Sequence, residues 1–135
     1  MRNQDGFTLI ELLIAVAIIA TLAAIVMPNF VSVKTKSFDG AAKADLRNMI
    51  VSQENYFSDT QAYTDVAVPP GDRADLDGNG TEDFRASRGV ALGVTAYTDG
   101  FQITSSHNSS GNTWCVNSSG SASVAPGAIV KSGSC

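Results

Sequence analysis

The chain has 135 residues, which is enough for one domain and too few for two domains of ordinary size. Hydrophobic residues make up 44% of it and charged residues 16%, so it can build a core and is not a disordered chain. Thirteen acidic residues against nine basic ones give a net charge of −4. A protein that binds the phosphate backbone of nucleic acid needs a positive charge. Nucleic acid is therefore not an expected partner of the globular part.

The N-terminal part of the chain is strongly apolar. Residues 7–27 contain one charged side chain, Glu11, and otherwise only the hydroxyl groups of Thr8 and Thr21 are polar. As an α-helix this segment would be about 32 Å long, and the hydrocarbon core of a bilayer is about 30 Å thick. We therefore expect a helix that can span a membrane. An ionised Glu11 inside it costs about 2.5 to 3.5 kcal/mol and needs a partner of opposite charge.

The residues around Gly6 form a recognisable motif. A secretory signal is cut after its apolar stretch, whereas a cut after Gly6 would leave the apolar stretch in the mature protein. The run Gly6-Phe7-Thr8-Leu9-Ile10-Glu11-Leu12-Leu13-Ile14 resembles the prepilin processing motif of type IV pilins and type II secretion pseudopilins. Pro28 stands where that family has its helix proline. The likeness is dense over residues 1–30 and looser as far as Tyr63.

The resemblance implies a processing reaction and an assembly role. A membrane prepilin peptidase would cut between Gly6 and Phe7 and methylate the new amine of Phe7, and Glu11 would pair with the N-terminus of a neighbouring subunit. The physical argument agrees, because the new cationic amine lies four residues before Glu11 and two offset helices could neutralise both charges. The alternative is a plain membrane anchor in which Glu11 reaches toward the lipid headgroups.

The chain after the apolar segment predicts a second helical half. Pro28 lacks an N–H group and should kink or open the helix. Past Gly40, apolar residues recur at helical spacing and predict an amphipathic helix that ends near residues 58–59 and buries its stripe against a sheet. The stripe consists of Ala42, Leu46, Met49, Ile50 and Phe57.

The C-terminal half predicts a long loop followed by strands. Residues 60–88 are rich in Asp, Gly and Pro and are expected to form a loop. Strands are predicted at residues 90–97, 101–106 and 113–117, the first two joined by a hairpin turn at 98–100, with weaker candidates at 122–124 and 128–130. The expected fold is α+β: a long N-terminal helix on a small antiparallel sheet, as in pilins. Its parts are a leader (1–6), a membrane and fibre-core helix (7–27), an amphipathic helix (28–59) and a globular head (60–135).

An acidic segment in the predicted loop indicates a cation site. Oxygen-bearing residues alternate there as in the first half of a calcium loop: Asp75, Asp77 and Asn79 as side-chain ligands, the Thr81 carbonyl, and Asp83 near the ninth position. Ala86 stands at the twelfth position, where an EF-hand has a bidentate Glu. Either another part of the chain completes the site, or calcium binds weakly, with a dissociation constant of about 10⁻⁴ to 10⁻³ M. The alternative is an acidic turn without an ion. Some type II secretion pseudopilins also bind calcium in a loop.

The two cysteines, Cys115 and Cys135, predict a disulfide rather than a metal site. The chain has no C-x-x-C pair and one histidine, His107, and its membrane-directing segment places the head in an oxidising compartment. His107 is expected at the surface or in a turn. Motifs for a serine hydrolase, a phosphate-binding loop and a zinc protease are missing from the sequence, so an enzyme is not expected.

These features together predict a structural subunit of a type IV pilus that polymerises into a helical, extracellular fibre. The resemblance implies that the subunit waits in the inner membrane and is extracted by an assembly ATPase and a platform protein. The first alternative is a type II secretion pseudopilin in a periplasmic pseudopilus. The second, from a different class, is a binding domain anchored to the membrane. The sequence does not separate adhesion, twitching motility, DNA uptake and electron transfer, nor a major from a minor subunit.

Overall fold

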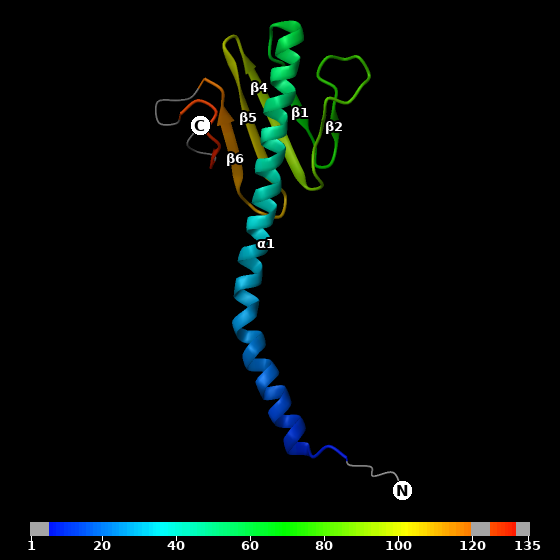
Figure 1. Ribbon diagram of the computed structural model, residues 1–135, viewed down its shortest axis with the longest axis vertical. Coiled ribbons are helices and arrows are strands. Elements are labelled where there is room, and N and C mark those ends of the chain that lie inside the picture. Colours follow the sequence, from blue (N-terminus) through cyan, green and yellow to red (C-terminus); the bar gives the residue numbers. More distant parts are fainter. Residues whose placement is uncertain (1–5, 120–124, 132–135) are drawn as a thin grey trace. The chain divides into compact units, whose positions relative to one another are not determined.

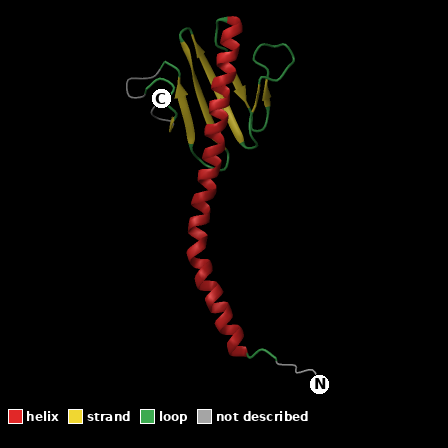
Figure 2. Ribbon diagram, viewed as in Figure 1, coloured by secondary structure: helices red, strands yellow, loops and turns green. Residues whose placement is uncertain are grey.

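A computed structural model of the chain describes residues 6–119 and 125–131. The chain forms two compact units, Met1–Lys34 and Thr35–Cys135, and the second is called the head below. One helix, α1 (Leu9–Thr60), has 52 residues and contributes to both units. In the head, the C-terminal half of α1 lies across an antiparallel sheet, as Figures 1 and 2 show.

Seven strands occur in the described part of the head. Five of them form one antiparallel sheet in the order β1-β4-β5-β6-β7. The other two form a small hairpin, β2-β3. The strand bounds are β1 (Val66–Val68), β2 (Arg73–Ala74), β3 (Phe84–Arg85), β4 (Val90–Tyr97), β5 (Gly100–His107), β6 (Thr113–Asn117) and β7 (Val130–Lys131).

The predicted apolar stripe of α1 forms the core with the sheet. Ala42, Leu46 and Met49 are 0% exposed, and Ile50 is partly buried against the same cluster. Their partners are the inward-facing residues of the three longest strands, including Val90, Leu92, Val94, Phe101, Ile103 and Val116. Burying a side chain the size of Leu or Met contributes about 1.5 to 3 kcal/mol. The prediction that this stripe packs on a sheet is confirmed.

Polar contacts hold α1 in register with the strands. Ser105 in β5 donates from its hydroxyl to the carbonyl of Ala42 at 2.9 Å. Gln53, which is 0% exposed, accepts a hydrogen bond from the backbone N–H of Thr64 and donates one to the Thr64 carbonyl. A buried amide whose donor and acceptor are both hydrogen-bonded loses little free energy on leaving water. These contacts therefore add specificity to the apolar packing.

The prediction of a strandless loop over residues 60–88 is wrong, because β1, β2 and β3 lie within it. Val68 and Phe84 from this segment are buried in the core. Strands of two or three residues are too short to show an alternating pattern, and they form only because β4 offers an edge to β1 and because β2 and β3 pair with each other.

The helix does not open at Pro28, since α1 is helical on both sides of it. A proline removes one backbone hydrogen bond, which a helix of this length can lose without ending. The predicted end near residues 58–59 falls within two residues of Thr60. Strands at 90–97 and 113–117 are confirmed, β5 is one residue longer at each end than predicted, and β7 begins where the 128–130 candidate ends. The candidate at 122–124 lies outside the described residues.

Candidate functional sites

The predicted cleavage site precedes the helix. Residues 6–8 have no regular secondary structure, and Phe7 is 89% exposed. The Gly6–Phe7 bond therefore lies in an exposed segment outside the helix, and exposed segments without regular structure are the preferred sites of proteolysis.

The start of α1 is stabilised by a capping box. Thr8 precedes the first helical residue, and its hydroxyl accepts a hydrogen bond from the Glu11 backbone N–H at 3.3 Å. The Glu11 carboxylate accepts in return from the Thr8 backbone N–H at 2.9 Å and from the Thr8 hydroxyl at 2.8 Å. This reciprocal arrangement satisfies N–H groups that a helix start leaves open. Glu11 therefore has an intramolecular partner within one chain, a role that the sequence analysis missed although the T-x-x-E spacing indicates it.

The large apolar side chains of the first unit lie on its surface and do not form a core. Within the described part of that unit, the large hydrophobic side chains between Phe7 and Val33 are 53% to 89% exposed. The helix is long and apolar enough to cross a membrane. Apolar surface of this extent marks a region that contacts lipid or other protein.

The acidic loop between β2 and β3 is organised around Asp75. Its carboxylate accepts hydrogen bonds from the backbone N–H groups of Gly80 at 2.7 Å and Gly78 at 2.8 Å. These hydrogen bonds hold the pKa of Asp75 below its usual range, and the bond from Gly80 has the largest effect. Both glycines have positive φ, 72° at Gly78 and 84° at Gly80, which other residues adopt only with strain.

The loop brings three of the five predicted ligands together. Carboxylate oxygens of Asp75, Asp77 and Asp83 lie within 4.8 Å of one another. The amide of Asn79 is turned to its neighbours, with its Nδ2 donating to Asp77 at 2.5 Å and its Oδ1 accepting from the Thr81 backbone N–H at 2.7 Å. Three converging carboxylates form a hard oxygen site of the kind that Ca²⁺ prefers.

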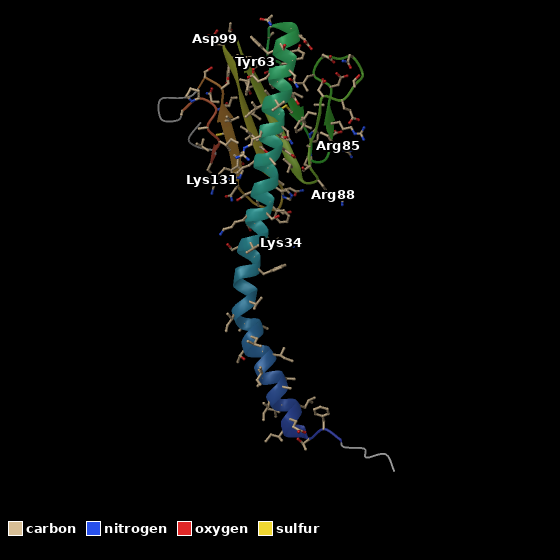
Figure 3. The ribbon with its side chains drawn as sticks, viewed as in Figure 1. Lys34, Tyr63, Arg85, Arg88, Asp99 and Lys131 are labelled. Atoms are coloured by element: carbon tan, nitrogen blue, oxygen red, sulfur yellow. The ribbon has the colours of Figure 1, made fainter. Side chains whose placement is uncertain are left out.

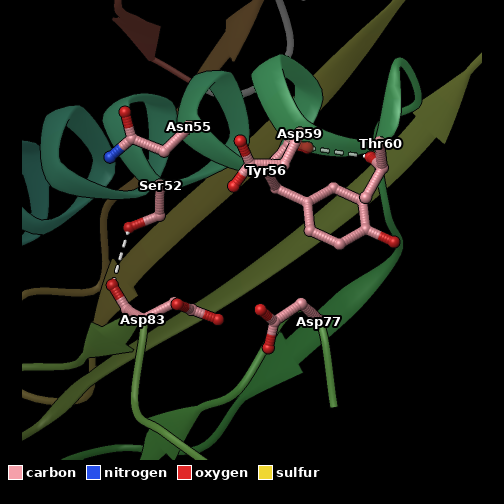
Figure 4. A pocket seen from close by; sticks show the side chains of 7 residues that line it. All are labelled: Ser52, Asn55, Tyr56, Asp59, Thr60, Asp77 and Asp83. Carbon is pink, nitrogen blue, oxygen red and sulfur yellow. Dashed lines mark hydrogen bonds between the residues drawn. The ribbon is translucent and has the colours of Figure 1, made fainter. Parts of the chain in front are cut away.

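A cavity of about 150 Å³ lies between this loop and the end of α1. Figure 4 shows Asp77 and Asp83 on one side of it and the α1 residues on the other, and the Ser52 hydroxyl donates to the carbonyl of Asp83 at 3.0 Å. Asn55 and Asp59 add side-chain oxygens to the lining from α1. The sequence analysis missed them, since they lie more than fifteen residues before Asp75 and only the tertiary fold places them here.

Two further predicted residues lie in or beside the sheet. Cys115 is 1% exposed in β6, and its predicted partner Cys135 lies outside the described residues, so their pairing remains a prediction. The expectation that His107 lies at the surface is wrong. It is 8% exposed and stacks on Phe38 of α1 with 4.3 Å between ring centroids, because its position on β5 faces the helix.

The long helix on an antiparallel sheet is consistent with the α+β fold of pilins, and the motif from Gly6 to Ile14 spans the start of that helix. Residues 1–27 match the family model of the prokaryotic N-terminal methylation motif. The motif predicted around Gly6 and Phe7 is thereby confirmed.

About half of the chain is similar to known pilins. It is 47% identical over 66 residues to the type IV major pilin protein PilA of Myxococcus xanthus. It is also 47% identical over 64 residues to the type IV wide pilus major component PilA4 of Thermus thermophilus. The type II secretion system core protein G of Pseudomonas aeruginosa is more distant, at 37% identity over 62 residues.

These matches cover only part of each protein. They span 49% and 47% of this chain, and 30% and 49% of the Myxococcus and Thermus proteins. The chain thus matches about a third to a half of the length of these two pilins.

Proposed function

We propose that this protein is a structural subunit of a type IV pilus and polymerises through α1 into an extracellular fibre. The observation that carries the proposal is the first unit, where an accessible Gly6–Phe7 bond precedes a helix with exposed apolar side chains. In one chain the large apolar side chains of this surface are more than half exposed. Lipid would cover it before assembly and other copies of the helix would cover it in a fibre.

Processing prepares the helix for this change of surroundings. A prepilin peptidase would remove residues 1–6 and methylate the amine of Phe7, and an inner-membrane platform with its ATPase would extract the subunit. The new amine adds a cation beside the apolar surface. In a bundle it would bind the Glu11 carboxylate of a neighbouring copy, which would then exchange its bonds to Thr8 for an ion pair away from water.

Two measurements test this proposal. Fibres sheared from the producing cells should contain a chain whose intact mass lacks residues 1–6 and includes one methyl group. Electron microscopy should show surface fibres that disappear when the gene is deleted. A chain that keeps Met1 in assembled material, or cells whose fibres persist after deletion, would overturn the proposal.

The same imaging separates a pilus from a secretion pseudopilus. The higher identity to the two pilus proteins than to the secretion protein favours a surface fibre. Fibres confined to the periplasm would support the alternative. Adhesion, twitching motility and uptake are tasks of an assembled fibre, and each can be tested in the deletion strain.

We also propose that the acidic loop binds a calcium ion. The three converging carboxylates of Asp75, Asp77 and Asp83 support it, and Asp59 of α1 stands across the cavity, where it can replace the carboxylate missing at position 86. A cation there would connect the loop to α1 and lower the repulsion among these groups.

Calorimetry of the detergent-solubilised full chain tests the calcium site. Millimolar calcium should give binding heat and raise the melting temperature, as expected for a ligand that binds the native state. Asp75→Asn with Asp77→Asn should abolish both effects, and Asp59→Asn should weaken binding about tenfold. Asp99→Asn, which removes an exposed carboxylate from another turn, is the matched control. No heat at millimolar calcium would leave an acidic turn without an ion.

A further inference from the structure

An open groove with two arginines lies beside the β2-β3 hairpin. It has a volume of about 570 Å³ and is lined by Pro70, Gly71 and residues 85–88. Arg85 and Arg88 are both exposed, and among the described residues neither side chain forms an ion pair or a hydrogen bond. Arg73, in contrast, forms a salt bridge with Glu82. The groove thus presents two positive charges on a chain of net charge −4.

The groove is held open by the backbone. Gly71 has φ of 78°, and the Asp72 carbonyl accepts a hydrogen bond from the Ala86 N–H at 2.9 Å, which ties the two walls together. Ser87 is anchored to α1, because its N–H and its hydroxyl donate to the Asp45 carboxylate at 2.6 and 2.9 Å. The backbone that carries the two arginines is therefore anchored on both sides of Ser87 by these hydrogen bonds.

An exposed carboxylate stands at the opposite end of the sheet. Asp99 lies in the two-residue turn between β4 and β5, and no hydrogen bond to its carboxylate is found among the described residues. Figure 3 labels Arg88 and Asp99 at opposite ends of the strands. The eight residues of β4 separate them by about 26 Å, which is far beyond the reach of an arginine side chain, so they cannot pair within one head.

Copies in a fibre would bring these two ends together. Subunits that assemble through the same helix point the same way, so one end of each head faces the opposite end of another along the fibre. Such a head-to-tail contact does not close and generates an open helical polymer. An anionic turn at one end and a cationic groove at the other are complementary in that arrangement.

We propose that the Asp99 turn of one head docks in the Arg85–Arg88 groove of a second copy of this chain. This contact rests on the proposed function, since it requires a fibre of parallel subunits. Aligned opposite charges steer the approach and set the register, while the apolar helices supply most of the binding. A guanidinium group is planar and can donate two parallel hydrogen bonds to a carboxylate, so Arg85 or Arg88 could bind the Asp99 carboxylate in this way.

Charge reversal in the full-length chain, expressed in its own cells, tests the contact. We expect Arg85→Glu with Arg88→Glu to lower the yield of sheared fibres about fivefold or more, with the membrane pool of the subunit unchanged, because like charges would then meet. Asp99→Arg should have a similar effect. The combination of all three substitutions should restore the yield to within about twofold of wild type, since the charges are opposite again.

The control pair is Arg47→Glu with Lys131→Glu, which changes the charge equally at two exposed residues outside the groove. It should leave the yield within about twofold of wild type. Full yield from the groove variant or from Asp99→Arg, or no rescue by the combination, would overturn the contact while wild-type fibres still support the proposed function. A wild-type strain without fibres would overturn the proposed function and this contact with it.

Discussion

The two halves of α1 differ in the solvent exposure of their apolar side chains. In the first unit, Leu13 and Ile14 are more than half exposed, whereas in the head Leu46 and Met49 are 0% exposed. The difference lies in their surroundings, because the sheet covers the apolar stripe of the second half, whereas the large apolar side chains of the first half are more than half exposed. One helix thus combines a surface that other molecules must bury with a stripe that stabilises the head.

The largest effect should come from removing the charge in the apolar half. Glu11→Ala should reduce fibre yield at least about tenfold, since the processed amine of a neighbour would lose its counter-ion in an apolar bundle. The head should keep its melting temperature, because Glu11 belongs to the first unit and not to the core of the head. Quantitative immunoblotting of sheared and membrane fractions measures the yield.

Thr8→Ala is the control for the helix cap. It removes the partner of Glu11 in the capping box and keeps the carboxylate, so it separates a capping role from an assembly role. Loss of fibres in Thr8→Ala equal to that in Glu11→Ala would show that the cap, and not the charge, matters for assembly.

The buried half should respond to a cavity. Leu46→Ala should lower the free energy of unfolding of the head by about 2 to 5 kcal/mol, since the side chain is fully buried between α1 and the sheet. Val51→Ala is the matched control on the same helix, at 59% exposure, and should cost less than about 1 kcal/mol. Denaturant unfolding of the full chain in detergent, followed by Trp114 fluorescence, measures both. Equal losses would contradict the assignment of the core.

The predicted disulfide should stabilise the C-terminal part of the head. Cys135→Ser should lower the free energy of unfolding by about 3 kcal/mol in the chain-entropy model, and it avoids changing the buried Cys115. The measurement is thermal unfolding with and without reductant, which should affect only the wild type. Two free thiols in unreduced protein from the cell surface would show that the bond does not form.

The smallest effect concerns the start of the head, at Asp39. Burial raises the pKa of this carboxyl, but the hydrogen bond from Asn112, the nearby groups of Ser110 and Trp114 and the charge of Lys43 outweigh it, so the pKa is lowered. Because the folded pKa lies below the unfolded value, the charge stabilises the fold above about pH 4, and this stabilisation is lost as the pH falls through the folded pKa.

We expect Asp39→Asn to lower the free energy of unfolding at pH 7 by about 1 kcal/mol, and the difference from wild type should shrink at acidic pH. Denaturant titrations between about pH 2 and pH 7 measure it. Asp99→Asn, at an exposed turn, provides the comparison and should show no such dependence. A difference that stays constant with pH would contradict the stabilising role of the Asp39 charge.

The strands and the amphipathic stripe were predictable because their signals are local. One buried sheet face explains an alternating run such as Val90–Tyr97. One buried helix face explains a stripe such as Ala42, Leu46 and Met49. The acidic ligands were also predictable as a group, since they are close in sequence. Asn55 and Asp59 were not, because only the tertiary fold brings α1 next to the loop.

By itself, the sequence determined the processing motif, the apolar helix and the three long strands, because each depends on neighbouring residues and on a repeating pattern. Only the tertiary structure decided that β1, β2 and β3 interrupt the long loop and that Gln53 and His107 are buried. Only it placed an arginine groove and an acidic turn at opposite ends of the sheet. The physical reason is that these features come from contacts between residues far apart in the chain, whose free energy does not depend on any local pattern.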